Sequence, residues 1–250
     1  MKHLKKIAQR CIIHLPVVAG ICIAGQTYGQ QAADSAAESP WSVNVDIASR
    51  YVWRGMKLSD SPVLQPAAEY AAGGFAVGAW GSYSMAQGEN QEVDLYASYN
   101  YEFVTLTVTD YFAGPDSLVT GGYFEWEQEK TIHTVEASLT IDGPEAFPAQ
   151  LIVGTLVYGN DLNEDAKSQY STYVEINRTW EKKDISYKPF IGLVPMKSGF
   201  YATDGAQLIN AGIEVSREIA VTEQFSLPLS LSLSTDPYHK NAFFTVIISL

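Results

Sequence analysis

The sequence has few of the residues that most catalytic and metal sites use. Its two cysteines, Cys11 and Cys22, both lie in the first 29 residues, and only His133 and His239 follow that segment. Disulfides and thiol chemistry are therefore excluded from the remainder. Neither histidine stands in a context that places it beside an activated serine. We therefore predict that the protein is not an enzyme and that it has no catalytic residue, no metal site and no cofactor. For His133 we expect a surface role.

The first 29 residues are basic at their start and apolar afterwards. Four Lys and Arg residues precede an apolar stretch from Cys11 to Ala24, and small residues follow near Gly29. This pattern indicates a cleaved secretory signal peptide over residues 1–29. The apolar stretch is interrupted by Pro16 and is shorter than the ~20 residues of a spanning helix. Residues 30–40 are rich in Ala, Ser and Gln and predict a flexible lead-in to one folded domain, 41–250.

Positive charge is scarce in the predicted mature chain. The leader carries four of the 16 Lys and Arg residues and no acidic residue, which leaves 12 basic against 28 acidic residues and a formal charge of −16. Nucleic acid binding requires clustered cations, so nucleic acid is excluded as a partner. No later stretch has the length and hydropathy of a spanning helix, so membrane residence would have to come from strands.

From Trp41 onward apolar and polar residues alternate with a period of two, which is typical of a strand with one apolar and one polar face. The clearest case is Phe225-Leu227-Leu229-Leu231-Leu233, which alternates with serines at 226, 230 and 232. A two-sheet sandwich also alternates, but the polar positions here often carry carboxylates or serines at mid-strand. About twelve strands of roughly ten residues are predicted, as a membrane barrel requires: 42–53, 63–72, 75–86, 92–101, 103–113, 131–141, 149–159, 169–180, 185–196, 207–219, 224–234 and 241–250.

The connections between these strands alternate in length. Tight turns such as 72–74, 101–102 and 181–184 alternate with longer polar loops such as 54–62, 114–130 and 159–168. Short periplasmic turns and longer extracellular loops are typical of a transmembrane, antiparallel, up-and-down outer-membrane β-barrel, and this all-β fold is our prediction.

Aromatic residues are expected to form a girdle at each end of the barrel. The predicted outer girdle contains Tyr51, Trp53, Tyr83, Tyr111, Phe112, Tyr158 and Tyr170, and the inner one contains Trp41, Tyr70, Phe75, Tyr99, Tyr101, Phe103, Trp180, Tyr187 and Phe225.

The segment Ser49–Gln65, SRYVWRGMKLSDSPVLQ, resembles the first hairpin of the TorF-type porin family, a group of bacterial outer-membrane proteins. That hairpin carries an aromatic-Arg-Gly step followed by a Ser-rich loop, Pro and Gln. The similarity continues through Gly74–Ser82, Glu92–Tyr96 and Thr109–Phe112, about the first third of the predicted mature chain. The resemblance implies a barrel of a Gram-negative bacterium that works in passive transport, with no particular substrate.

Charged residues on the wet face of the strands are the candidate functional residues. By parity, the predicted pore-lining set is Asp46, Arg50, Glu69, Glu92, Asp94, Glu136, Glu175, Lys188 and Glu214, with Arg54 at the rim. In a narrow passage, such carboxylates favour cations and neutral solutes. Alternatively, the basic members pair with neighbouring carboxylates and fill the lumen.

Three functions are consistent with this pattern. The first is a narrow outer-membrane channel through which small polar solutes diffuse past an acidic lining. The second is a closed structural or adhesive barrel that uses the loop 114–130 as its contact surface, and the third is a soluble periplasmic sandwich or lipocalin-like binding protein. If the protein has either of the first two functions, its expected partners are outer-membrane lipid, lipopolysaccharide and the barrel-assembly machinery.

Overall fold

The computed structural model describes residues 39–115, 122–223 and 225–250. The predicted signal peptide and most of the predicted lead-in lie outside these residues. In the described part of the chain, no helix has the length and hydropathy needed to cross a membrane.

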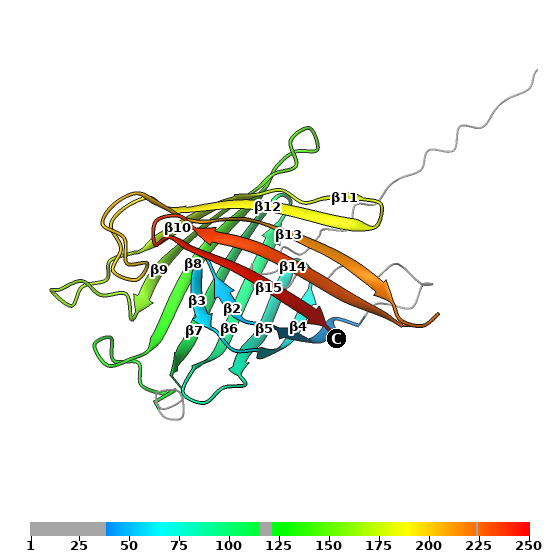
Figure 1. Ribbon diagram of the computed structural model, residues 1–250. Helices are drawn as coiled ribbons and strands as arrows, with labels where there is room; N and C mark the ends of the chain where they lie inside the picture. The colour runs from blue at the N-terminus through cyan, green and yellow to red at the C-terminus, as the bar shows by residue number, and fades with distance from the viewer. Residues whose placement is uncertain (1–38, 116–121, 224) are drawn as a thin grey trace, which may run out of the picture.

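The described residues form a closed antiparallel β-barrel with 12 strand positions, which confirms the predicted fold class (Figure 1). Neighbours in sequence are neighbours in the sheet, and the last strand returns to pair with the first. The strands are β1 (Trp41–Ala48), β4 (Val63–Ala72), β5 (Phe75–Ser84), β6 (Asn90–Tyr101), β7 (Val104–Pro115), β8 (His133–Asp142), β9 (Gln150–Gly159), β10 (Thr172–Asn177), β11 (Trp180–Lys182), β12 (Ile185–Val194), β13 (Gln207–Ala220), β14 (Ser226–Asp236) and β15 (Asn241–Ser249).

One of the 12 positions is shared by two short strands. Both β10 and β11 pair with β12, through Val174↔Leu193 and Trp180↔Tyr187 respectively. The single strand predicted over 169–180 is therefore two pieces that lie along the same neighbour.

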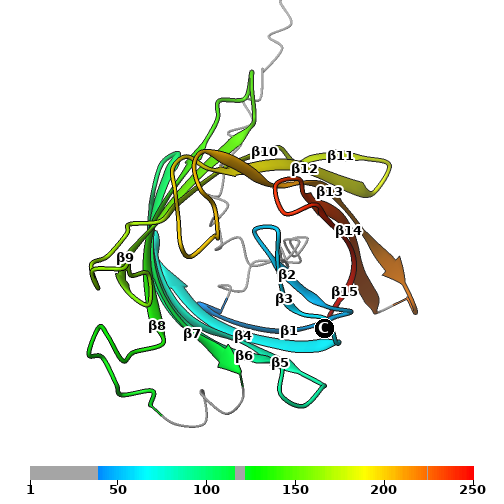
Figure 2. The same cartoon turned by 60° about the vertical axis from the view of Figure 1, so that its left-hand side comes forward.

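The predicted strand 42–53 is wrong at its C-terminal end. Strand β1 stops at Ala48, and residues 51–53 form β2 (Tyr51–Trp53), which pairs with β3 (Met56–Ser59) in a separate two-stranded sheet. Figure 2 looks towards the barrel opening and shows the β2–β3 hairpin folded inside it. The first long connection is thus an inward hairpin between β1 and β4.

The wall has an apolar outer face and a polar inner face. On β14, the outward Leu231 and Leu233 are exposed, whereas the inward Ser234 is buried. Glycines on the inner face make room for large inward side chains: a Cβ at Gly78 would lie 2.4 Å from the ring of Tyr96, and one at Gly192 would lie 2.0 Å from the hydroxyl of Tyr173. The inner surface is therefore packed locally, large residue against glycine.

Aromatic residues are exposed at the turn end of the barrel, as predicted for one girdle. Trp41, Phe75, Tyr99, Tyr101 and Phe103 are among the exposed rings there. The predicted girdle at the loop end is only partly present.

At the loop end, Tyr83 and Tyr170 are exposed, but Tyr51 and Tyr111 are buried inside the barrel. Phe112 lies against Tyr123 of the β7–β8 loop. Parity alone does not distinguish a ring that faces outward from one that packs against an inward hairpin or beneath a loop.

Candidate functional site

The site that the fold creates is the part of the barrel interior next to the β2–β3 hairpin. The hairpin turns at Arg54-Gly55, and both residues have positive φ angles, 49° and 81°. Two-residue turns of this kind match the right-handed twist of paired strands and favour glycine. A Cβ at Gly55 would lie 1.9 Å from the carbonyl oxygen of Ile209, so the tip of the hairpin lies directly against β13.

Two hydrophobic clusters hold the hairpin across the lumen. At its root, Tyr51 packs with Ala48, Val63, Trp80 and Ile247 of strands β1, β4, β5 and β15. At its tip, Trp53 and Met56 pack against a second cluster. The members of the second cluster are Tyr173, Val194, Tyr201 and Ile209, from β10, β12, β13 and the β12–β13 loop.

Arg54 lies inside the barrel and not at the rim, which corrects the prediction. Its guanidinium donates two hydrogen bonds to the carboxylate of Glu136 on β8, at 2.5 and 2.9 Å, and one to the hydroxyl of Tyr201 at 2.8 Å. It also lies 4.4 Å from the ring centroid of Trp53 and 4.6 Å from that of Tyr173. A planar guanidinium suits this combination of bidentate pairing and stacking, which lysine cannot reproduce.

The root of the hairpin is held by a different set of polar contacts. Glu89 in the β5–β6 loop accepts hydrogen bonds from the hydroxyls of Ser59, Ser61 and Ser84. The hydrogen bond from Ser59 contributes most to lowering the pKa of Glu89, from 4.5 to about 2. Beside it, the exposed Lys57 pairs with Asp60 at 2.9 Å.

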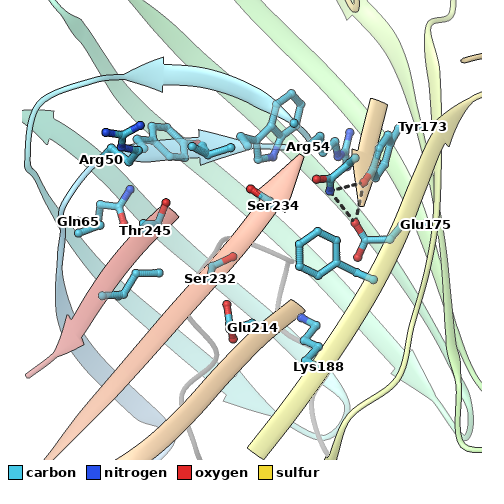
Figure 3. Close-up of a pocket in the computed structure, with 18 of the residues that line it drawn as sticks. Arg50, Arg54, Gln65, Tyr173, Glu175, Lys188, Glu214, Ser232, Ser234 and Thr245 are labelled. Atoms are coloured by element: carbon cyan, nitrogen blue, oxygen red, sulfur yellow. Dashed lines mark hydrogen bonds between the residues drawn. The ribbon is translucent and has the colours of Figure 1, made fainter. Parts of the chain in front are cut away.

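A cavity of about 110 Å³ lies beside the hairpin, towards strands β12 to β15 and β1. Figure 3 shows its charged and hydroxylated lining. Glu175 accepts hydrogen bonds from Tyr173 at 2.6 Å and from Asn177 at 3.2 Å. Lys188 and Glu214 are register partners on β12 and β13. The remaining polar residues in its lining include Arg50, Arg54, Gln65, Asn210, Ser232, Ser234 and Thr245.

The nine predicted pore-lining residues occupy different parts of the interior. Arg50, Glu175, Lys188 and Glu214 line the cavity beside the hairpin, and Arg50 lies 3.6 Å from Asp60. Glu136 is the partner of Arg54 and is almost fully buried, as are Asp46, Glu92 and Asp94. Glu69 accepts a hydrogen bond from Tyr96 at 2.9 Å. The structure therefore brings four of the nine together at the cavity and one to the hairpin tip.

The longer loops are tied to the residues that receive the hairpin tip. The hydroxyl of Ser171 donates to Asp161 at 2.8 Å and lies 2.6 Å from that of Ser198, which in turn accepts from the amide of Tyr201 at 3.0 Å. His239 contacts Asp236 at 2.5 Å and the carbonyl of Ala202 at 3.2 Å. These contacts fix the β12–β13 loop and hence the position of the Tyr201 ring.

His133 is on the outer side of the wall but is covered. Its ring stacks on Trp126 with centroids 3.8 Å apart, and its two nitrogens contact Asp110 at 2.8 Å and the carbonyl of Tyr123 at 2.7 Å. The ring is fully buried beneath the β7–β8 loop. In the described residues, no group of three or more His, Cys, Asp or Glu side chains forms a metal site.

Comparison with known proteins gives one family and several structures. The model of a family described as "Bacterial protein of unknown function (Gcw_chp)" matches residues 32–131, which include the hairpin and strands β1 to β7. No curated protein matches the sequence significantly.

Among solved structures, the outer membrane protein opdK from Pseudomonas aeruginosa is 12% identical, with a TM-score of 0.37. The alignment covers 86% of this chain and 61% of that protein, so the chain spans less than two thirds of its length. A second structure, OccK1 (OpdK) from the same organism, gives 12% identity, a TM-score of 0.35, and coverage of 86% and 66%. The fold described above rests on the strand register itself.

Proposed function

We propose that the protein is an outer-membrane barrel through which small polar solutes diffuse along an acidic lumen that the β2–β3 hairpin narrows. The observation that carries this proposal is the contrast between the two faces of one closed sheet. Exposed apolar side chains such as Leu106, Val108 and Ile191 cover the outside, while carboxylates and hydroxyls line the inside. Only a closed barrel satisfies every backbone group of a sheet within lipid.

The direction of insertion follows from the connections. We place the short turns, such as 72–75 and 101–104, in the periplasm and the longer loops outside, as in other outer-membrane barrels. The exposed rings of Trp41, Tyr99, Tyr101 and Phe103 support an interfacial position for the turn end. The similarity of Ser49–Gln65 to the TorF-type family belongs to the same proposal.

Selectivity for cations or neutral solutes is the expected property of the lumen. Most of the ionisable groups on the inner wall are acidic, and rings of carboxylates favour cations in a narrow pore. Glu214 and Glu175 line the cavity, so solutes that pass beside the hairpin would meet both carboxylates there.

Planar-bilayer recording tests the proposal. The purified mature chain should produce stepwise current with a preference for cations, and Glu214→Gln should reduce that preference. The matched control is Glu129→Gln, because Glu129 is an exposed residue of the β7–β8 loop on the outer side of the wall and does not line the cavity. Folded protein that is electrically silent, or a preference equally sensitive to both substitutions, would contradict the proposal.

The hairpin itself favours a second candidate, a closed barrel with a structural or adhesive role. Arg54 at its tip pairs with Glu136 of β8 and its root is packed against β1, β4, β5 and β15, so the hairpin spans the lumen at that level. For this candidate, the wild type is electrically silent in bilayers, and current appears only when the hairpin is removed.

A further inference from the structure

We propose that the β2–β3 hairpin is a movable gate, latched shut by the pairing of Arg54 with Glu136 across the lumen. The inference rests on the proposed channel function, because a gate has meaning only if the barrel conducts. It adds a regulated step to that function and names the two residues that control it.

The hairpin is built as an independent unit. Strands β2 and β3 pair only with each other and form a sheet separate from the barrel. Moving the hairpin therefore breaks no ladder hydrogen bond of the barrel wall. What it breaks is a set of side-chain contacts, which can have two discrete arrangements.

The two ends of the hairpin are held differently. At the root, the backbone amide of Ser49 donates to the carbonyl of Val246 at 2.8 Å, and its hydroxyl accepts from the amide of Val246 at 3.0 Å. Glu89 accepts hydrogen bonds from Ser59, the last residue of β3, and from Ser61. This end is therefore a fixed pivot.

The tip depends on one charged residue and on ring contacts. Arg54 supplies the ion pair with Glu136 and the hydrogen bond to Tyr201. Trp53 meets the rings of Tyr111 and Tyr201 at centroid distances of 5.5 and 6.2 Å. In a lumen that contains water, Arg54 and Glu136 can each be hydrated when they separate. The strength of their ion pair therefore sets the equilibrium between the closed and open positions of the hairpin tip.

Release of the tip would change the lining as well as the width of the passage. The cavity beside the hairpin already has Arg54 and Gly55 in its wall, so displacement of the turn joins this space to the region that the tip occupies. Glu136, which is now paired and buried, would be added to the acidic lining. The open state should be wider and more selective for cations than the closed one.

Charge reversal tests the latch with the full mature chain in planar bilayers. Arg54→Glu places two carboxylates at the tip, and Glu136→Arg places two cations there, so each variant should show a severalfold rise in mean conductance. The double variant Arg54→Glu/Glu136→Arg restores an opposite-charge pair and should return towards the wild-type value. The matched control is Lys57→Glu, which makes the same charge change on the same hairpin at an exposed pair with Asp60.

Two further measurements separate the possible failures. Heat-modifiable gel mobility shows that each variant is a folded barrel, and a variant in which a short glycine linker replaces residues 51–59 gives the conductance without a gate. If the wild type conducts and the two single variants match it, or if the double variant does not recover, the gate is wrong and the channel stands. If the wild type and the two single variants are silent while the linker variant conducts, the hairpin is a fixed plug and the gate is wrong. If the wild type and the linker variant are both folded and silent, the channel is wrong and the gate is overturned with it.

Discussion

Leu231→Arg tests the assignment of the two faces of the wall, on which the membrane proposal depends. Leu231 lies at the middle of β14, points outward and pairs with Val215 and Val246 of the adjacent strands. Its side chain is 38% exposed, so in lipid it contacts acyl chains. An arginine at the midplane of a barrel's lipid face costs about 2–4 kcal/mol of folding free energy.

The matched control is Ser232→Arg, which places the same side chain one residue further along, on the inner face. There it points into the cavity, between its register partners Glu214 and Thr245. An opposite charge and water are both available at that position, so we expect a change within about 1 kcal/mol. The expected difference between the two variants is thus at least about 1 kcal/mol, which is the low end of the midplane cost less the largest change expected for the control.

Urea unfolding of residues 30–250 in phospholipid vesicles, followed by tryptophan fluorescence, measures both free energies of unfolding. If the barrel were soluble, Leu231 would be a solvent-exposed leucine, and its replacement would change stability by no more than about 0.5 kcal/mol. Equal effects of the two substitutions, or a protein that stays monomeric and folded without any amphiphile, would refute the assignment of the outer face to lipid.

Three other predictions concern packing and pH. Gly78→Ala should destabilise the barrel by about 1–3 kcal/mol in the same unfolding assay, because the new methyl group meets the Tyr96 ring at 2.4 Å. The hairpin root should loosen as pH falls from 4.5 towards 2, because Glu89 has a lowered pKa and its contacts are complete only above the unfolded value; amide exchange of residues 57–61 reports this. The contact of His239 with the β12–β13 loop should be strongest below pH 6.5 and weaken as pH rises through its raised pKa, which amide exchange of residues 200–204 measures.

Each of these has its own control. Gly205→Ala meets no atom within 4 Å and should leave stability unchanged, so an equal loss there would remove the packing explanation. Glu89→Gln should abolish the pH dependence at the root, and a root that loosens identically in both proteins contradicts it. For His239, burial alone lowers the pKa, while the hydrogen bonds to Asp236 and to the Ala202 carbonyl outweigh this effect. A loop whose exchange does not change with pH beyond the intrinsic rate would show that this balance is wrong.

The strand pattern and the lengths of the connections were enough to predict most of the fold. Where leucines alternate with serines, as between Leu227 and Leu233, the pattern predicts both a strand and which of its residues face inward, because side chains on a pleated strand point alternately to its two faces. The inward position of carboxylates such as Glu175 and Glu214 followed from the same parity.

The inward hairpin could not be predicted in the same way. Tyr51, Val52 and Trp53 continue the β pattern of the preceding strand, and the sequence has no proline or glycine where β1 ends. The local signal was the Arg54-Gly55 step, which favours a tight turn. Where the hairpin tip binds depends on Glu136, which is 82 residues from Arg54. The pattern of residues within one strand does not indicate such a long-range pairing.

The joint between the first and last strands is short. Strand β1 has three register pairs with β15, Asp46↔Ser249, Ile47↔Ile248 and Ala48↔Ile247, against eight with β4. The ring of Tyr51 packs in one cluster with Ala48 and Ile247, that is, on both sides of this joint. Lateral parting of the wall towards the bilayer would have to pull these side chains apart. The segment that narrows the barrel along its axis therefore also resists its opening sideways.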